Sequence, residues 1–430
     1  MVDLKRLTEA YIEYVQFHFT TIFGDLKSVE FPTGIWDEMS DGTGVDGSSL
    51  GFLTTEQSDM RVNPDHETLA VLPWEPRVAR LICDIEDNSG APHPTCPRSI
   101  LKKAIEDARS LGFENKTRPE LEWYFVDEEI APVDIGGYMD TTPLDACAPL
   151  RREITDDLLE MGVGLKTIHH ENGPAQQEIE FAPQDAQRQA DNVQTAKLAI
   201  KTEADFMDIT ATFMAKPFPD EAGSGMHIHQ YITRDGANAF TDPKTGISDN
   251  LRHFVGGIME HADAMTAILN PTTNSYKRLV PGHEAPVYKS WGVGNRTALI
   301  RVPGYEKSAR VEYRAADCTA NIYLTSALLL AAGLNGVKKK TEPNPPTSEN
   351  VEKMTPRRRR ELGITQLPTS LDEALNHLEG SDFVRKVLGA EIVDIFIETK
   401  RKECTDYHRA KRAGGTQEWQ WEYDNYLLRA

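Results

Sequence analysis

Cysteine is scarce in this chain: it has five among 430 residues, and no two of them form a Cys-x-x-Cys pair. A disulfide framework and the common zinc-ribbon spacing are therefore excluded, and the usage fits a reducing compartment. The first residues are charged and lack the apolar core of a secretory signal. No apolar run approaches the roughly 20 residues of a membrane span. These absences predict a cytoplasmic protein with no membrane partner.

Positive charge is also in short supply, since 47 Lys and Arg residues face 67 Asp and Glu residues, giving a formal net charge of −20. Nucleic-acid binding needs clustered basic residues, so we expect no nucleic-acid partner. No Gly-x-x-x-x-Gly-Lys sequence occurs, which excludes a P-loop. The surplus carboxylates either form a solvated surface or gather to hold metal ions.

Helix and strand patterns divide the chain into two parts. Residues 1–95 predict a small domain, with a helix over residues 1–15 followed by short strands that include Val15–Phe23 and Lys27–Phe31. Prolines at positions 92, 94 and 97 then mark a break. We therefore expect a domain boundary near residue 95.

Residues 96–430 predict a larger domain in which strands alternate with helices. A long helix is expected over Asp191–Phe213 and another over Leu371–Leu388. The apolar segment Leu324–Leu334 is too short to span a membrane and predicts a buried helix.

Acidic and basic side chains recur two residues apart on several predicted strands, and this spacing places them on one face of a strand. The four groups are Glu120-Leu-Glu122, His170-Glu171 with Glu178-Ile-Glu180, His227-Ile-His229, and Arg310-Val-Glu312-Tyr-Arg314. Any one of them alone is more typical of an exposed sheet or of a structural histidine pair. Four in one chain favour a common site.

Carboxylates that converge need cations between them. Two of them about 4–5 Å apart repel by roughly 3–4 kcal/mol at an effective dielectric constant near 20. Divalent ions with oxygen ligands answer this, and one imidazole ligand is compatible with Mg²⁺ or Mn²⁺. Arginines at positions 278, 296, 301, 310 and 314 suit phosphates and a substrate carboxylate. The residues therefore predict metal-assisted phosphoryl transfer from a nucleotide to an anionic substrate.

Longer motifs, in a fixed order along the chain, resemble the glutamine synthetase family, as a type I-like glutamate–ammonia ligase. They include Asp46-Gly-Ser-Ser49, Pro119-Glu-Leu-Glu122, His169-His-Glu171, Gly223-Ser-Gly-Met-His-Ile-His229, Asn270-Pro-Thr-Thr-Asn-Ser-Tyr-Lys-Arg278 and Arg310–Arg314. The resemblance implies an α+β fold with an N-terminal β-grasp domain. It also implies a larger catalytic domain whose curved antiparallel sheet forms a funnel-shaped site, and a double-ring dodecamer with sites at subunit junctions.

The resemblance also implies roles for individual residues, with ATP and two or more Mg²⁺ or Mn²⁺ ions at each site. Metal ligands would be Glu122, Glu171 and Glu178 in one group, and Glu120, His227 and Glu312 in the other. His229, Arg296, Arg301, Lys307 and Arg310 would contact the nucleotide and its phosphates, and Gly223, Arg278 and Arg314 would bind glutamate. Asp46, Tyr138, Glu171 and Glu284 would form the ammonium pocket and its flap, and Asp46 and Asp59 would come from a neighbouring subunit. Asp46, Asp59, Glu284 and Arg296 are the expected catalytic residues.

Some positions depart from the family pattern. Ala222 stands where the family usually has Asn, beside the glutamate-binding glycine, and Lys166 replaces the expected Glu near the nucleotide. We expect Ala222 to weaken glutamate binding rather than to change the substrate, because loss of one hydrogen bond to a charged group costs about 1.5–3 kcal/mol.

Two alternatives stay open. The first is a γ-glutamylamide synthetase that uses a primary amine or polyamine in place of ammonia. The second is a catalytically inactive relative that serves as a binding protein. The ammonium-pocket residues named above favour ammonia, and the six metal positions favour an active ligase.

Overall fold

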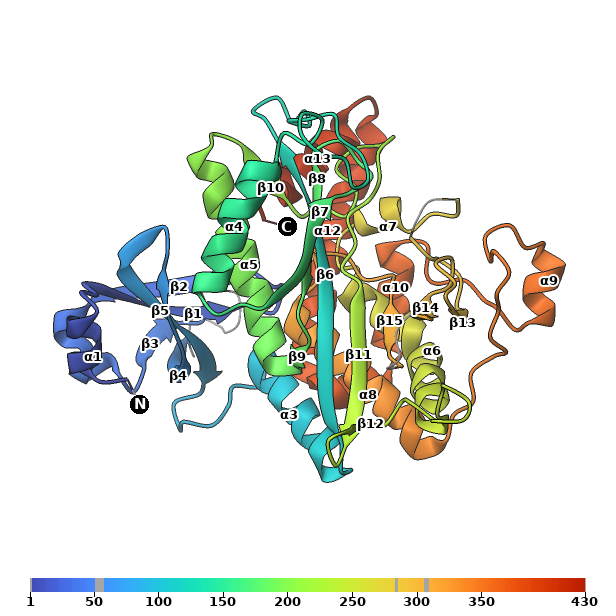
Figure 1. The fold of residues 1–430 in the computed structure, drawn as a ribbon, viewed down its shortest axis with the longest axis horizontal. Helices are drawn as coiled ribbons and strands as arrows, with labels where there is room; N and C mark the ends of the chain where they lie inside the picture. The colour runs from blue at the N-terminus through green and yellow to red at the C-terminus, as the bar shows by residue number, and fades with distance from the viewer. Residues whose placement is uncertain (1, 51–57, 283–284, 305–308, 430) are drawn as a thin grey trace.

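The computed structural model describes residues 2–50, 58–282, 285–304 and 309–429. Figure 1 shows a small N-terminal sheet at the left, with a larger body of strands and helices beside it. Each part has its own sheet, which confirms the expected α+β organisation. Glu284 and Lys307 fall outside the described residues.

The N-terminal sheet has five strands in the order β2-β1-β5-β4-β3. Its elements are α1 (Leu4–Glu9), β1 (Tyr14–Thr20), β2 (Leu26–Pro32), the short 3₁₀ turn Thr33–Ile35, α2 (Trp36–Met39), β3 (Thr43–Asp46), β4 (Asp59–Leu72) and β5 (Glu75–Glu86). β1 and β5 run parallel, and the other neighbours are antiparallel. Alternate residues of β1 (Val15, Phe17, Phe19) are buried and pack with Phe31 and Trp36, as the period of two requires.

The second sheet carries the chemistry-bearing residues. Its main path is β13-β14-β15-β11-β6-β8-β7, antiparallel except between β13 and β14. The strands are β6 (Glu114–Val126), β7 (Leu165–His170), β8 (Gln176–Phe181), β9 (Gln184–Asp185), β10 (Thr210–Thr212), β11 (Ile228–Arg234), β12 (Ala237–Asn238), β13 (Trp291–Val293), β14 (Ile300–Val302) and β15 (Val311–Tyr313). β6 is the long central strand in Figure 1.

Helices back this sheet and fill the rest of the larger domain. They are α3 (Pro97–Ser110), α4 (Ala148–Glu160), α5 (Ala186–Phe206), α6 (Asp249–Leu269), α7 (Ser275–Arg278), α8 (Ile322–Lys339), α9 (Pro356–Glu361), α10 (Leu371–Glu379), α11 (Asp382–Leu388), α12 (Ala390–Ala413) and α13 (Gln417–Tyr426). The predicted buried helix is α8, which packs closely on α6. A Cβ on Gly257 would lie 2.1 Å from the Ala332 carbonyl oxygen, so glycine is needed where the two helices cross.

Several predicted boundaries are wrong for local reasons. The N-terminal helix ends at Glu9, and Tyr11 follows with φ 57°. The long helix spans Ala186–Phe206, and the last residues predicted for it form the short strand β10. The helix predicted over residues 371–388 breaks at Gly380, because Ser381 accepts a hydrogen bond from the Val384 amide and caps a new helix.

Arg98, at the start of α3, joins the two parts of the chain. Its buried guanidinium donates to Asp191 of α5 at 3.0 Å, to Asp65 of β4 at 2.6 Å and to Asp84 of β5 at 3.1 Å. The Tyr323 hydroxyl of α8 donates to the same Asp191 at 2.7 Å. Arg98 is therefore one of the buried groups that hold the N-terminal sheet on the larger domain.

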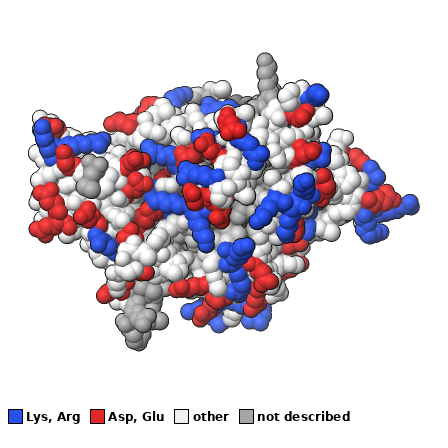
Figure 2. Space-filling model, turned by 90° about the horizontal axis from the view of Figure 1, so that it is seen from below, with Lys and Arg blue, Asp and Glu red and all other residues white. Residues whose placement is uncertain are grey.

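Acidic and basic side chains alternate over much of the face shown in Figure 2. Within the described residues, no helix is both long enough and apolar enough to cross a lipid bilayer.

Replacing Arg98 by methionine tests the domain joint. We expect Arg98→Met to lower the free energy of unfolding by about 3–5 kcal/mol, because removal of one partner leaves buried carboxylates uncompensated. Arg109→Met is the matched control on the same helix, since Arg109 pairs with Glu106 on the exposed surface, where such pairs contribute at most about 1 kcal/mol. Urea denaturation measures both variants, and equal losses would contradict a special role for Arg98.

Candidate active site

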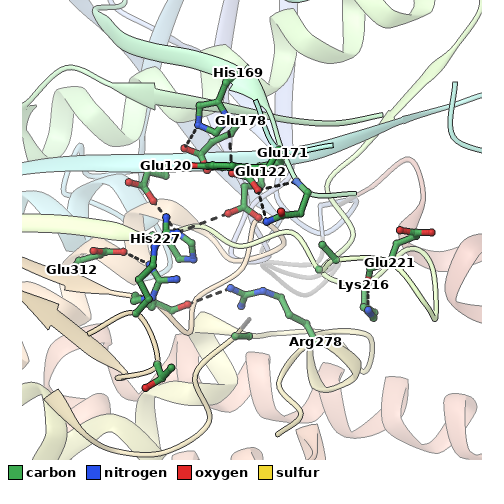
Figure 3. Close-up of a pocket in the computed structure, with 18 of the residues that line it drawn as sticks. Glu120, Glu122, His169, Glu171, Glu178, Lys216, Glu221, His227, Arg278 and Glu312 are labelled. Atoms are coloured by element: carbon green, nitrogen blue, oxygen red, sulfur yellow. Dashed lines mark hydrogen bonds and ion pairs between the residues drawn. The ribbon is translucent and has the colours of Figure 1, made fainter. Parts of the chain in front are cut away.

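A cavity of about 850 Å³ opens on the catalytic sheet. It brings together twelve of the residues singled out in the sequence: Glu120, Glu122, Tyr138, Glu171, Glu178, Gly223, His227, Arg278, Arg296, Arg301, Glu312 and Arg314. Figure 3 shows the carboxylates of Glu120, Glu122, Glu171 and Glu178 on one side, with Arg278 across the cavity from them. Its wall therefore combines an acidic and a basic side.

Strand register explains why distant residues meet here. Glu120 and Glu122 of β6 lie directly opposite Glu180 and Glu178 of β8. On the other side of β6, β11 places His229 opposite Glu312 of β15. Because side chains two residues apart share a face, the β6–β8 and β11–β15 registers place these residues on common faces of the sheet.

Glu120 lies between His229 of β11 and His227, which immediately precedes that strand. Its carboxylate contacts His227 Nδ1 at 2.8 Å and His229 Nε2 at 2.7 Å. Burial alone would raise the pKa of Glu120, but His229 and His227 outweigh it and hold the pKa well below its ordinary value. Burial opposes ionisation of Glu312 too, yet His229 and Arg314 lower its pKa to about 2. This end of the cavity keeps its carboxylates ionised and suited to a cation.

The second acidic group behaves in the opposite way. Burial and the nearby charge of Glu171 raise the pKa of Glu122 to about 7. Burial and the charges of Glu120 and Glu122 raise the pKa of Glu178 well above its ordinary value. Without a cation, burial and then repulsion between the carboxylates therefore favour the protonated form of these groups. Carboxylate oxygens in this number, with an imidazole beside them, fit a hard divalent ion such as Mg²⁺ or Mn²⁺.

His169 belongs to this second group, although sequence reasoning gave it no role. Its Nε2 lies 3.3 Å from Glu178 and its Nδ1 lies 3.8 Å from Glu171. These three side chains are close enough to share an ion. The His-His-Glu triplet was a usable signal, because His169 precedes Glu171 by two residues and so shares its face.

Arginines line the cavity as well. Arg301 donates to Glu312 at 2.7 Å, and Arg314 forms an ion pair with the same carboxylate. Arg310 donates to His229 Nδ1 at 3.1 Å. Arg296 lines the cavity and is hydrogen-bonded to Tyr138. Guanidinium groups thus lie beside the carboxylates that would hold metal, and they suit an anionic substrate.

Arg278 and the glycine loop form another corner. The Arg278 guanidinium donates to the carbonyl of Ala315 at 2.8 Å. A Cβ on Gly223 would lie 2.7 Å from Arg278 Cγ, so only glycine fits against this side chain. The Gly223 carbonyl accepts from Gln176 at 3.1 Å, and the Ala222 carbonyl accepts from the Tyr124 hydroxyl at 2.7 Å. The loop backbone is therefore held in place without the amide side chain that the family usually has at position 222.

Further lining residues went unnoticed in the sequence, among them Lys216, Asp220, Glu221 and Glu352. Lys216 donates to the Glu221 carbonyl, and burial lowers its pKa. No spacing rule identifies these residues, because they lie on irregular segments between the strands and helices.

Asp46 and Asp59 lie away from the cavity. They face each other on the paired strands β3 and β4 of the N-terminal sheet, and both are exposed. The hydroxyls of Ser48 and Ser49 donate to the Asp46 carboxylate at 2.7 and 2.6 Å and, with the Ser48 amide, lower its pKa to about 2. Neither aspartate lines the cavity of its own chain.

Two family models cover nearly the whole chain. Residues 11–88 match the glutamine synthetase β-grasp domain, and residues 94–423 match the glutamine synthetase catalytic domain. The chain belongs to the glutamine synthetase family. The expected β-grasp and catalytic fold is confirmed with it.

Relatives in this family share nearly full length with the chain. The glutamine synthetase of Thermotoga maritima is 44% identical over 99% of this chain and 98% of its own. That of Pyrococcus abyssi is 42% identical over 95% and 96%, and that of Methanocaldococcus jannaschii is 39% identical over 97% and 95%. Two solved structures, "Apo GmaS without ligand" and "GmaS/ADP complex-Conformation 1", each superpose with a TM-score of 0.88 at 30% identity, covering 99% of both chains.

Substitution of Glu122 tests the cation requirement of the second group. In the presence of a chelator we expect Glu122→Gln to melt at the same temperature as wild type or higher, because burial and Glu171 oppose its ionised form. The rise in Tm on adding Mn²⁺ should shrink by at least half, because a ligand is lost. Thermal melts with EDTA and with Mn²⁺ measure both effects. Glu260→Gln on the exposed face of α6 is the control, and a wild-type Mn²⁺ response in Glu122→Gln would remove Glu122 from the ligand set.

Proposed function

We propose that this member of the glutamine synthetase family joins L-glutamate to ammonia at the expense of ATP, through γ-glutamyl phosphate. The cavity is the observation that carries the proposal, because its lining combines two groups of carboxylates with Arg278, Arg296, Arg301 and Arg314. The full-length match to proteins named glutamine synthetase supports glutamate and ammonia as substrates.

Metal ions have a place on the acidic wall. Glu122, Glu171 and Glu178 would hold one ion, and Glu120, His227 and Glu312 would hold the other. Such ions, when bound, neutralise the phosphates of ATP and stabilise charge on the transferred phosphoryl group. The carboxylate and imidazole donors fit Mg²⁺ and Mn²⁺ alike.

The arginines and the glycine loop position the first step. Arg278, Arg314 and the Gly223 carbonyl would bind the α-carboxylate and α-ammonium of glutamate and leave its γ-carboxylate facing the nucleotide. His229, Arg296, Arg301, Lys307 and Arg310 would hold the triphosphate. One γ-carboxylate oxygen then bonds to the γ-phosphorus of ATP, the bond to the β–γ bridging oxygen breaks, and ADP leaves.

The second step needs an ammonium pocket, for which we propose Asp46, Tyr138, Glu171 and Glu284, with Asp59 beside Asp46. Ammonium gives one proton to Asp46, and the ammonia attacks the acyl phosphate carbon. A C–N bond forms, the bond from that carbon to the phosphate oxygen breaks, and phosphate leaves with a second proton from the nitrogen. Serine hydrogen bonds lower the pKa of Asp46 to about 2 in the single chain. We propose that Asp46 exchanges its serine partners for the ammonium when the site assembles, which makes its carboxylate a better proton acceptor. Glu284 would close the pocket against water, which hydrolyses acyl phosphates.

The position of the aspartates supports an oligomer. Asp46 and Asp59 are exposed on the N-terminal sheet and line no part of their own cavity, so a neighbouring chain would supply them to the site. We propose a homo-oligomer, and the family resemblance favours a double-ring dodecamer in the cytoplasm.

The amine is the point at which an alternative has some support. A γ-glutamylamide synthetase that uses a primary amine or polyamine is favoured only by the similarity to the two GmaS structures at 30% identity. Identities of 39–44% to proteins named glutamine synthetase outweigh it. Ammonia is the preferred amine.

An amine panel decides between them. With ATP, Mg²⁺ and glutamate present, we expect phosphate release to depend on ammonium, and the product to be glutamine by mass spectrometry. Methylamine, ethanolamine and a polyamine should give at least tenfold lower kcat/KM. Faster turnover with any of these amines would identify that amine, not ammonia, as the substrate. If glutamate gave no phosphate release with ammonium or with any of the other amines, the proposed ligase activity would be rejected.

Mixing two inactive variants tests the shared site. Asp46→Ala and Arg314→Ala oligomers should each be inactive, while a reassembled mixture should regain activity, because some junctions then combine an intact Asp46 with an intact Arg314 from the neighbouring chain. The control mixes Asp46→Ala with an Asp46→Ala, Arg314→Ala double variant, which offers no intact junction. No recovery in mixed oligomers verified by native mass spectrometry would refute a site shared between chains.

A further inference from the structure

A second buried cluster of charged side chains lies behind the carboxylates of the cavity. It contains Asp134, Asp145, Arg151 and His170, all of them buried. Asp134, Asp145 and His170 are close enough together to share a metal ion. Each carboxylate, however, already faces its own basic group. Asp145 accepts from Arg151 at 2.6 Å, and Asp134 contacts His170 Nε2 at 3.0 Å. The charges of the cluster therefore balance one another. Its function has to be inferred from the backbone segments to which it is hydrogen-bonded.

One end of the Asp134–His170 pair holds the segment of a proposed metal ligand. His170 Nδ1 lies 2.7 Å from the carbonyl oxygen of Glu171. A carbonyl only accepts, so this nitrogen carries the hydrogen and the imidazole ring fixes the Glu171 peptide. The Glu171 amide is held from the other side by the Gln176 carbonyl at 2.8 Å. The backbone that aims the Glu171 carboxylate into the cavity is thus fixed at both of its polar groups.

The other end holds the segment that carries Tyr138. Asp134 Oδ1 accepts from the amides of Gly136 at 3.1 Å and Ala175 at 2.5 Å. On the far side of Tyr138, the Met139 amide donates to the His170 carbonyl at 3.0 Å. Tyr138 itself is 44% exposed and lines the cavity, where its ring contacts His169 and its hydroxyl is hydrogen-bonded to Arg296. Its backbone is held on both sides by these bonds to Asp134 and His170.

Gly136 packs directly against the His170 ring, and this contact restricts the position of the Asp134–His170 pair. A Cβ at this position would lie 2.7 Å from His170 Nε2, closer than any real contact of this kind. The chain therefore passes directly over the imidazole ring, and a movement of His170 has to move the Tyr138 segment with it. Glu171 and Tyr138, which come from different segments, are connected through two side chains that do not line the cavity.

We propose that Asp134 and His170 are positioning residues that set Glu171 of the metal group and Tyr138 of the ammonium pocket at a fixed separation. The inference rests on the proposed function of those two residues. Partners of this kind, one shell away from the ligands, typically contribute about 10–100-fold to metal affinity or activity. Because the pair reaches both segments, one substitution should weaken the metal step and the amine step together.

The decisive variant is Asp134→Asn, measured against wild type and against Asp263→Asn. The control makes the same chemical change at a partly buried ion pair of the catalytic domain, where Asp263 contacts Lys289 at 2.6 Å and lines no part of the cavity. We expect Asp134→Asn to raise the Kd for Mn²⁺, followed by the EPR signal of the free ion, by about 10-fold or more. The KM for ammonium should rise alongside, while the KM for glutamate stays within twofold, because Arg278 and Gly223 lie on other segments. Asp263→Asn should leave all three constants within twofold.

A second variant keeps every charge. Gly136→Ala adds only the Cβ that displaces the His170 ring, and it should raise the same two constants without changing the KM for glutamate. It decides the matter if Asp134→Asn does not fold. The inference would be overturned if Asp134→Asn had the same Kd for Mn²⁺ and the same KM for ammonium as the Asp263→Asn control. If Asp134→Asn does not fold, the same result in Gly136→Ala would overturn it. Failure of wild type itself to bind Mn²⁺ or to ligate ammonia would instead overturn the proposed function.

Discussion

Repulsion between carboxylates governs the centre of this molecule. Glu122, Glu171 and Glu178 are more than nine-tenths buried in one cavity with Glu120 and Glu312 nearby. Two such charges 4–5 Å apart repel by roughly 3–4 kcal/mol at an effective dielectric constant near 20. The β6–β8 register brings these side chains together, because it sets Glu122 opposite Glu178 and Glu120 opposite Glu180. The repulsion therefore has its origin in the sheet.

The two acidic groups of the cavity differ in how the repulsion between carboxylates is offset. At Glu120 and Glu312, histidines and Arg314 lie close enough to keep the carboxylates ionised. At Glu122 and Glu178, no such cation lowers the pKa enough, and both values rise. A divalent ion thus has most to gain at the second group, where it replaces protons. Since protons and metal compete there, metal affinity at this group should rise with pH more steeply than at the first.

The sequence predicts those parts of the site that lie on regular strands, where side chains two residues apart share a face. Alternation along a strand was enough to place Glu120 with Glu122, and Glu312 with Arg314, on common faces, and the order of the motifs identified the family. It did not reach Lys216, Glu221 or Glu352, because they line the cavity from irregular segments whose path depends on tertiary packing. Helix ends were misplaced where one side chain decided them, as Ser381 does when it caps a new helix after Gly380.

The sequence predicts that Asp46 acts in the site of a neighbouring subunit, and the fold gives this prediction a physical basis. Arg98 ties the N-terminal sheet to the catalytic domain through three carboxylates, and Asn321 adds hydrogen bonds to the Thr21 and Ile22 carbonyls. These bonds oppose a rotation of the sheet that would bring Asp46 to its own cavity. In the proposed oligomer, a fixed sheet would present Asp46 to a neighbouring chain in one orientation. Catalysis by a proton acceptor depends on placement within hydrogen-bond reach. The buried joint in one subunit and the positioning pair behind Glu171 and Tyr138 in the next would then fix the two sides of a single ammonium pocket.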